Sequence, residues 1–208
     1  MEQSLQTPTL CTSSVLEGGN DMALPTIKLT AAVKGRIFAA LIGAGVVGPS
    51  AYVATELTIP SESIVTIPHG DPVGFNTICA GHLVKKGEVV KKSYTEQECI
   101  DIFVKDWIAH EKLLDGVVKV PYRSPWMKGA LTDFTFNKGI GNVASSTLLK
   151  NLNNKQYDAA CEQLTRWVYA KGKLLPGLVI RATKQYSYCM GNEPADYKQK
   201  MDEYKGGW

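Results

Sequence analysis

Eighteen consecutive residues without a charged side chain, IFAALIGAGVVGPSAYVA, occupy positions 37–54 of this chain. Eighteen residues is about the minimum length for a helix that spans a membrane. The cations that precede the run are Lys28, Lys34 and Arg36, a flank that keeps the N-terminus in the cytoplasm. Such a run either spans a bilayer or lies inside a protein core, so it constrains the fold more than any other part of the sequence.

Three interpretations of residues 37–54 compete. A buried core helix is disfavoured, because three glycines and a proline would each weaken a soluble helix by about 1 kcal/mol or more. A cleavable signal peptide is disfavoured, because Tyr52, Val53 and Thr55 stand where small residues are needed. The third interpretation is an uncleaved anchor, only marginally hydrophobic because ten of its residues are Ala, Gly, Ser or Pro. We therefore expect a disordered, cytoplasmic, basic N-region over residues 1–36 and a weak signal-anchor over residues 37–54.

The rest of the chain, residues 55–208, is long enough for one globular domain with a single core, and it contains no repeats. The whole chain has 208 residues, a net charge of +3 and a pI near 8.5. This charge suits an anionic polymer, but no cluster of Lys or Arg indicates nucleic-acid binding. No pair of His or Cys residues has the spacing of metal ligands. We expect a monomer without metal, cofactor or nucleic-acid partner.

Helical patterns dominate this domain. Thr95 and Glu98 form a capping box at the start of a predicted helix over residues 93–114, in the sequence SYTEQECIDIFVKDWIAHEKLL. Further helical stretches are predicted over residues 128–137, 145–152, 156–170 and 178–191. Strand character is confined to residues 64–79, where β-branched residues flank the turn-forming PHGDPVG. The predicted fold class is mainly α, an α+β arrangement of a helical domain with a small β-hairpin lobe.

Two acids and a hydroxyl surround this predicted hairpin, in ESIVTIPHGDPVGFNTICAGHL over residues 62–83. Glu62 comes just before the hairpin, Asp71 lies in its turn and Thr77 on its return strand, so the three side chains could converge across a cleft. Glycosidic bond cleavage requires two carboxylates in different surroundings, one to protonate the leaving oxygen and one to activate water or attack the sugar. A nearby hydroxyl can hold the water. Spacing alone is weak evidence, since surface carboxylates are usually only solvated.

The pattern Glu62-x8-Asp71-x5-Thr77, followed by TICAGHL, resembles the catalytic signature of the phage lysozymes, glycoside hydrolase family 24. The resemblance continues through YTEQEC, FTFNKGIGNVASSTLLKNLN and YDAACEQLTRWVYAKGKLLPGLVIRATKQYSYC, and covers residues 56–190. It implies a lysozyme-like fold and a muramidase that hydrolyses the β-1,4 bond between N-acetylmuramic acid and N-acetylglucosamine in peptidoglycan. Within the family the glutamate is the general acid, the aspartate positions or activates water, and the threonine helps to hold it.

The resemblance also implies supporting residues. The residues expected to line the substrate cleft are Leu83, Phe136, Asn137, Thr147 and, from the far wall, Arg181. His82 matches a structural histidine of the family whose partner corresponds to Asp106, so we expect an ion pair between them. The chain departs from the family at Ser63, where a glycine is usual, and at His69, where an aromatic residue is usual. His110 carries no signal.

A subset of these enzymes, the signal-anchor-release endolysins, resembles the layout of this chain. They are exported, tethered inactive and then freed, usually when the membrane potential is lost. The resemblance implies that residues 37–54 are held in the host inner membrane, with a catalytic domain over residues 55–208 facing the periplasm. Glu62 follows the span by only eight residues, so the tethered form would keep it against the membrane surface. After release, the enzyme would act from the periplasm on peptidoglycan and lyse the host cell.

Cysteines fit an exported domain, because an oxidising compartment favours disulfides. The four cysteines of this domain are Cys79, Cys99, Cys161 and Cys189. Of the three possible connectivities we favour Cys79 with Cys99 and Cys161 with Cys189, while a regulatory thiol at Cys79, close to Thr77, is a competing idea. Residues 37–54 contain no cysteine and Cys11 would stay in the cytoplasm until release. We therefore expect activation by refolding and not by thiol exchange.

Two other function classes stay open. A lytic transglycosylase would cut the same glycan but needs only the acid, so Asp71 and Thr77 would be unnecessary. A non-catalytic, membrane-tethered peptidoglycan-binding protein would keep a basic cleft and would survive the loss of Glu62. The complete set of Glu, Asp and Thr favours the muramidase over both.

Overall fold

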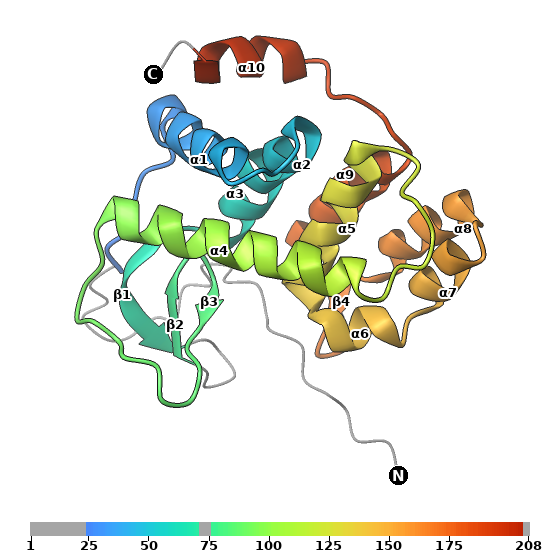
Figure 1. Ribbon diagram of the computed structural model, residues 1–208. Coiled ribbons are helices and arrows are strands. Elements are labelled where there is room, and N and C mark those ends of the chain that lie inside the picture. Colours follow the sequence, from blue (N-terminus) through green and yellow to red (C-terminus); the bar gives the residue numbers. More distant parts are fainter. Residues whose placement is uncertain (1–23, 71–75, 206–208) are drawn as a thin grey trace.

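The structure, a computed structural model, describes residues 24–70 and 76–205 and is dominated by helices (Figure 1). The helices are α1 (Ala31–Gly43), α2 (Gly48–Val53), the π-helix η1 (Ala54–Thr58), α3 (Ile59–Glu62), α4 (Glu96–Asp115), α5 (Pro125–Lys138), α6 (Ile140–Ala144), α7 (Thr147–Asn153), α8 (Tyr157–Glu162), the 3₁₀-helix η2 (Gln163–Arg166), α9 (Pro176–Cys189) and α10 (Tyr197–Lys205). The strands are β1 (Val65–Gly70), β2 (Asn76–Cys79), β3 (His82–Leu83), β4 (Tyr169–Ala170) and β5 (Lys173–Leu174). Of the N-region over residues 1–36 that the sequence predicts to be disordered, residues 1–23 lie outside the described residues. Residues 31–36 are helical, because Thr30 caps α1 through the Val33 N–H and Val33 is buried in the core.

The sheets are small and antiparallel. β1, β2 and β3 form one sheet in that order, and Thr77 on the central strand pairs with His69 on one side and Leu83 on the other. The second sheet, β4 with β5, differs from the sequence prediction of strands over residues 64–79 alone and of a helix that continues to residue 170. The chain instead turns back at Lys171 and Gly172, both with positive φ, a conformation that ends a helix and suits glycine.

Capping residues in the sequence mark the N-termini of the long helices α4 and α5. The capping box at α4 is complete, since the Thr95 side chain accepts from the Glu98 N–H and the Glu98 side chain accepts from the Thr95 N–H. At α5, Ser124 caps the Met127 N–H and Pro125 occupies the first turn, where its missing N–H costs no hydrogen bond. α4 runs across the molecule, with the β1–β2–β3 sheet against one half and the α6–α8 helices beyond its other end (Figure 1).

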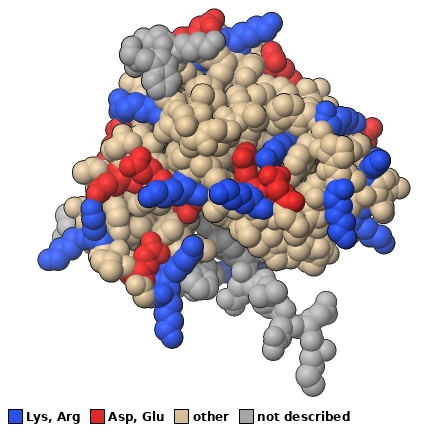
Figure 2. All heavy atoms as spheres, in the orientation of Figure 1, with Lys and Arg blue, Asp and Glu red and all other residues tan. Residues whose placement is uncertain are grey.

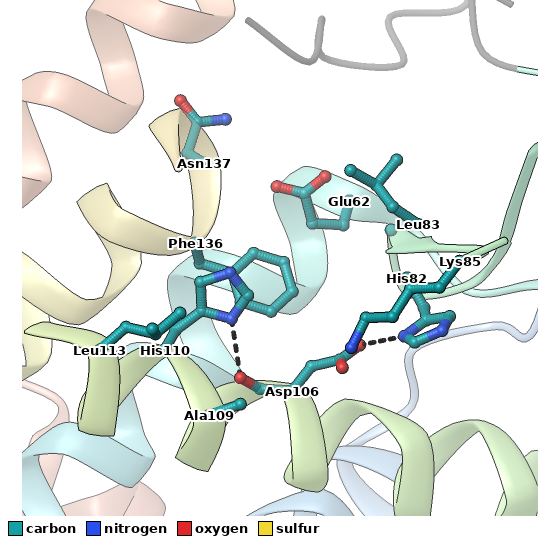
Figure 3. Close-up of a pocket in the computed structure, with 11 residues that line it drawn as sticks. Glu62, His82, Leu83, Lys85, Asp106, Ala109, His110, Leu113, Phe136 and Asn137 are labelled. Atoms are coloured by element: carbon teal, nitrogen blue, oxygen red, sulfur yellow. Dashed lines mark hydrogen bonds and ion pairs between the residues drawn. The ribbon is translucent and has the colours of Figure 1, made fainter. Parts of the chain in front are cut away.

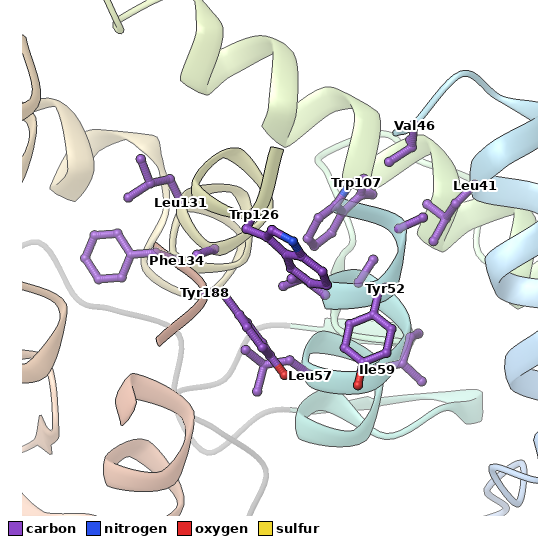
Figure 4. Packing of buried hydrophobic residues seen from close by; sticks show 14 of the residues in the cluster. Leu41, Val46, Tyr52, Leu57, Ile59, Trp107, Trp126, Leu131, Phe134 and Tyr188 are labelled. Atoms are coloured by element: carbon purple, nitrogen blue, oxygen red, sulfur yellow. The ribbon is translucent and has the colours of Figure 1, made fainter. Parts of the chain in front are cut away.

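Residues 37–54 supply part of the core of this structure, although residues 42–45 and Val47, around the turn between α1 and α2, are exposed. Ile37 and Leu41 on α1 have no exposed surface, and Tyr52 on α2 packs near Trp126, with ring centroids 5.6 Å apart (Figure 4). The glycines that disfavoured a core helix fall where helices end or begin: Gly45 has φ +89° between α1 and α2, and Gly48 starts α2. Across residues 24–70 and 76–205, no helix combines the length and apolar character needed to cross a bilayer.

The C-terminal helix covers the outer side of the N-terminal helices. α10 lies beside α1 at the top of Figure 1, where the Tyr204 ring packs against that of Phe38 with centroids 5.3 Å apart and planes tilted by 34°. Tyr197 meets the edge of Trp126, with centroids 4.8 Å apart. On the face shown in Figure 2, basic side chains are interspersed with acidic ones. The contacts of Tyr204 and Tyr197 show that α10 packs on both α1 and α5.

Candidate active site

A continuous helical stretch, residues 48–62, carries Glu62 at its C-terminal end. Its middle part, η1, is a π-helix in which the Ile59 N–H bonds to the carbonyl of Ala54, five residues earlier. π-turns of this kind often mark functional sites. The next residue, Ser63, ends the stretch with φ 60° and ψ 165°, and its N–H bonds to the Ile59 carbonyl at 3.0 Å. The departure from the usual glycine at Ser63 thus falls at a backbone conformation that glycine adopts most easily.

Glu62 faces a cavity of about 280 Å³ between the sheet and the helices α4 and α5 (Figure 3). The residues that line it are Glu62, Gly81, His82, Leu83, Lys85, Asp106, Ala109, His110, Leu113, Phe136 and Asn137. Its walls are mixed, with apolar surface from Leu83, Leu113 and Phe136, and polar groups from Glu62 and Asn137. A mostly apolar concave surface with a few convergent polar groups is typical of a ligand site.

The two oxygens of the Glu62 carboxylate have different surroundings. Oε1 accepts a hydrogen bond from Arg181 Nη1 at 2.7 Å, and the Glu62 side chain is 15 % exposed. Oε2 lies beside Gly81. A Cβ atom added to Gly81 would be only 3.1 Å from Oε2, and the φ of +75° at this position also favours glycine. Among the described residues, none donates a hydrogen bond to Oε2. One oxygen is therefore fixed by the protein, and the other is left for a ligand in the cavity.

Behind Glu62, Arg181 belongs to a buried network centred on Asp133. Arg181 donates to both Asp133 oxygens, at 2.7 Å and 3.1 Å, while Gln185 and Thr58 donate at 2.6 Å and 2.7 Å. Although burial opposes the charge, the carboxylates of Asp133 and Glu62 raise the pKa of Arg181. Arg181 thus holds Glu62 from inside the protein and is not among the residues that line this cavity, although the resemblance implies a place in the far wall of the cleft.

Lys138 is a further buried cation near this network. Only 7 % of the residue is exposed, and burial together with the nearby Arg181 charge lowers the pKa of Lys138 to about 8. Neither Lys138 nor Asp133 was predicted from the sequence. The sequence does contain a signal for them. Asp133 and Lys138 are charged residues in the helical segment KGALTDFTFNK, where their neighbours are nearly all apolar or small.

His82 forms the expected pair with Asp106, with Nδ1 2.7 Å from Asp106 Oδ2. Its other nitrogen, Nε2, lies 3.0 Å from Glu88 Oε1. The hydrogen bond to Asp106, partly opposed by burial, raises the pKa of His82. The pair ties the β3 strand to α4 along one edge of the cavity.

His110, which carried no signal in the sequence, also lines the cavity. Its Nδ1 lies 2.7 Å from the backbone oxygen of Asp106, and its ring centroid is 4.8 Å from that of Phe136 (Figure 3). Asp106 lies one turn earlier on the same helix α4, whereas Phe136 lies on α5, so the packing of α4 against α5 brings His110 and Phe136 together at the cavity.

The other expected site residues are distributed as follows. Leu83, Phe136 and Asn137 line the cavity with Glu62, whereas Thr147 lines a separate hollow with Lys119 and Lys150. Thr77 is 7 % exposed, does not line the cavity, and donates a hydrogen bond to the His69 carbonyl at 3.2 Å. Asp71 lies outside the described residues. No group of three His, Cys, Asp or Glu side chains within the described ranges could hold a metal ion.

Two disulfides brace the site, in the pairings favoured from the sequence. Cys79 is joined to Cys99, which links β2 to α4, and Cys161 is joined to Cys189, which links α8 to α9. The first bridge therefore fastens the sheet that carries Thr77 to the helix that carries Asp106 and His110. The second fastens the helix that carries Arg181.

Known proteins resemble this chain across most of its length. The sequence profile of the phage lysozyme family, described as "Phage lysozyme", matches residues 60–185. The "SAR-endolysin" of Enterobacteria phage P21 is 36% identical over 157 residues, which cover 73% of this chain and 92% of that protein. The "SAR-endolysin" of Bacteriophage PS119 is 34% identical, with 78% and 96% covered. The crystal structure of the active form of the P1 phage endolysin Lyz superposes with a TM-score of 0.64 at 20% identity, covering 83% of this chain and 99% of that one. With a matching family profile over more than half of its residues and relatives above 30% identity, the chain belongs to the phage lysozyme family.

Proposed function

We propose that this protein is an endolysin that hydrolyses the β-1,4 bond between N-acetylmuramic acid and N-acetylglucosamine in peptidoglycan, with Glu62 as the general acid. Membership in the phage lysozyme family makes the chain a glycoside hydrolase. The single observation that carries the residue assignment is the Glu62 carboxylate, which lies at a cavity with Oε1 held by Arg181 and Oε2 left on the side of Gly81. A general acid needs one oxygen that reaches the substrate and a scaffold that fixes the other.

In the proposed reaction, Glu62 Oε2 delivers a proton to the glycosidic oxygen as the bond to the sugar breaks. The Arg181 guanidinium, already 2.7 Å from Oε1, stabilises the carboxylate that remains. Asp71 accepts a proton from the attacking water as the water oxygen bonds to the anomeric carbon, and Thr77 helps to hold that water. The Thr77 hydroxyl donates to the His69 carbonyl, so its own oxygen remains available to accept a hydrogen bond from water. Inverting chemistry of this kind requires carboxyl groups roughly 6.5–9.5 Å apart.

The cavity beside Glu62 matches the surface of a sugar. Phe136 and Leu83 offer apolar area for the C–H face of a pyranose ring, and Asn137 offers both a donor and an acceptor for its polar groups. Leu83 is 41% exposed on the short strand β3, where it is free to contact a long polymer. We therefore assign Leu83, Phe136 and Asn137 to substrate binding. Thr147 lines a different hollow, so only a glycan strand that extends beyond the cavity at Glu62 could contact it.

For residues 37–54 we propose two states. Before release they span the host inner membrane, with the remainder of the chain in the periplasm; after release they fold into the core as α1 and α2. The helical stretch that ends at Glu62 begins at Gly48, inside the proposed anchor. Membrane insertion would therefore remove the first part of the helix that positions the acid. Release would activate the enzyme by refolding, and an anchored form that became active on reduction alone would contradict this.

The test is cleavage of purified peptidoglycan by the full chain, because α1 and α2 supply core residues, with the new sugar ends identified by mass spectrometry. Wild type should release reducing N-acetylmuramic acid ends, and Glu62→Gln and Asp71→Asn should release almost none. Anhydro ends, or full activity in Asp71→Asn, would indicate a lytic transglycosylase. No cleavage by the folded wild type would indicate a peptidoglycan-binding protein.

A further inference from the structure

We propose that His110 is a specificity-determining residue, whose Nε2 accepts a hydrogen bond from the acetamido N–H of an N-acetylated sugar bound beside Glu62. This inference rests on the proposed function, since the ligand is the glycan that Glu62 cleaves. It adds His110 on α4 to the polar side chains that line the cavity, which otherwise come from Glu62 on α3, Asn137 on α5, Asp106 on α4, and His82 and Lys85 on and after β3.

The hydrogen bonding of the ring decides what His110 can offer. Nδ1 lies 2.7 Å from the backbone oxygen of Asp106, and a carbonyl oxygen can only accept, so Nδ1 must carry the hydrogen. In the neutral ring, Nε2 is then an acceptor with a free lone pair. Among the described residues, no donor is within hydrogen-bond distance of Nε2. Figure 3 shows this second ring nitrogen on the side of the ring away from the Asp106 contact.

Packing holds the ring in place before a ligand arrives. One contact is the Phe136 ring, with centroids 4.8 Å apart and planes tilted by 43°. The other is the backbone bond to Asp106, whose side chain is itself fixed by His82 at 2.7 Å. A side chain that is already ordered loses little conformational entropy on binding, so its hydrogen bond contributes more fully to affinity.

The groups around His110 match an acetamido substituent better than a bare hydroxyl. Such a substituent presents an N–H donor, a carbonyl acceptor and a methyl group. The cavity offers an acceptor at His110, an amide donor at Asn137, and apolar surface at Ala109, Leu113 and Phe136. Because a buried site built to pair with a polar group rejects an analogue that lacks it, loss of the acetyl group should be costly.

Two substitutions separate the two ring nitrogens. His110→Asn keeps a donor near the position of Nδ1, which can still bond to the Asp106 carbonyl, but has no acceptor near Nε2. His110→Gln can place its side-chain oxygen near the position of Nε2 and serves as the conservative rescue. Melting temperatures of both variants report whether the fold is retained.

The experiment compares kcat and KM on soluble peptidoglycan strands before and after chemical N-deacetylation. On acetylated strands, His110→Asn should raise KM about tenfold with kcat nearly unchanged, and His110→Gln should recover most of the loss. On deacetylated strands, wild type and His110→Asn should differ by less than about twofold. An equal loss for His110→Asn on both substrates, or no loss on either, would overturn the assignment.

Binding separates this inference from the proposed function. Calorimetric titration of the acetylated and deacetylated strands into the same proteins measures the contribution of His110 to affinity, even if no glycosidic bond is cut. A folded wild type that binds but does not cleave would contradict the proposed function alone. A tenfold weaker affinity of His110→Asn for acetylated strands only would still support the role of His110, and equal affinities would refute it.

Discussion

Two glutamates on one helical stretch, Glu56 in η1 and Glu62 at the end of α3, are both largely buried and both bound to cations, and Glu62 lines the cavity described above. The Glu56 side chain is 8 % exposed and accepts from Lys34 at 2.8 Å, from Lys200 at 2.7 Å and from the Tyr204 hydroxyl. These donors come from α1 and α10, at opposite ends of the chain. Glu62 has one cation, bound to one of its two oxygens.

The difference separates a structural carboxylate from a candidate catalytic one. Although burial would raise it, the pKa of Glu56 is lowered by the hydrogen bonds from Lys200, Lys34 and Tyr204. Its carboxylate is kept charged and covered, and it joins α1 and α10 to the helix that leads to the site. Burial and an ion pair therefore do not identify a catalytic acid by themselves. A free oxygen at a cavity, which Glu62 has, is the distinguishing feature.

The largest expected effect is on catalysis. Glu62→Gln should reduce the rate of peptidoglycan hydrolysis by about 10²–10⁴-fold, because the amide cannot donate a proton to the leaving oxygen. Glu56→Gln is the matched control on the same helical stretch, and below its melting temperature it should keep a rate within about threefold of wild type. Turbidity loss of purified peptidoglycan measures both. A comparable loss of hydrolysis rate in both variants would contradict the assignment of Glu62 as catalytic and Glu56 as structural.

Arg181→Met should lower the free energy of unfolding by about 3–5 kcal/mol, since it leaves the buried carboxylate of Asp133 without its cation. Urea unfolding followed by tryptophan fluorescence gives this number. Lys184→Met, on the exposed side of α9, removes the same charge from the same helix and should change stability by less than about 0.5 kcal/mol. A small effect of Arg181→Met would contradict the claim that Arg181 is the cation that compensates the buried charge of Asp133.

Glu56→Gln should lower the free energy of unfolding at pH 7 by about 2 kcal/mol, because Lys34 and Lys200 lose their shared partner. The pKa of Glu56 is lower in the folded chain than in the unfolded chain. Its contribution is thus complete above the unfolded value and is lost as the pH falls through the folded value. The gap between wild type and Glu56→Gln should narrow on acidification from pH 7 to pH 3.

The control for Glu56 is Glu203→Gln on the exposed face of α10, which should leave both the stability and its pH dependence near wild type. A gap between wild type and Glu56→Gln that stays constant from pH 7 to pH 3 would show that the charge of Glu56 does not stabilise the fold.

The smallest expected effect concerns the backbone next to the acid. Ser63→Gly should raise the free energy of unfolding by about 1 kcal/mol, because φ 60° with ψ 165° is strained for serine and allowed for glycine. Ser61→Gly, two residues earlier in helical backbone, should instead lower it by about 0.5 kcal/mol. Thermal unfolding measures both, and destabilisation by Ser63→Gly would mean that no strain is stored beside Glu62.

Local signals in the sequence predicted where the helices lie better than they predicted how the helices pack on one another. The capping box of Thr95 and Glu98, and the apolar periodicity that follows, depend on neighbours in the chain, and the structure has α4 where they predicted it. The β4–β5 hairpin was missed because WVYA continues a helical pattern, and only the positive φ at Lys171 and Gly172 turns the chain back. For residues 37–54 the glycines favoured an anchor over a core helix, because that argument places them inside one continuous helix; in the structure Gly45 lies between α1 and α2, and Gly48 begins α2.

The site was predictable in the same uneven way. Glu62, Leu83, Phe136 and Asn137 meet at one cavity, but they were named through a resemblance and not through spacing alone. The network of Arg181, Asp133 and Gln185 exists only because α5 packs on α9, and His110 enters the site only because α4 packs on α5. Such pairings over long sequence separations leave no local pattern to read.

The most direct test of the central claim, that the free oxygen of Glu62 cuts the glycan in this cavity, is a crystal structure of Glu62→Gln with a soluble peptidoglycan tetrasaccharide. We expect the glycosidic oxygen of one bond within hydrogen-bond distance of the residue 62 side chain, on the side of Gly81, with the neighbouring sugar against Phe136. A tetrasaccharide bound with every glycosidic oxygen out of reach of residue 62 would contradict the claim.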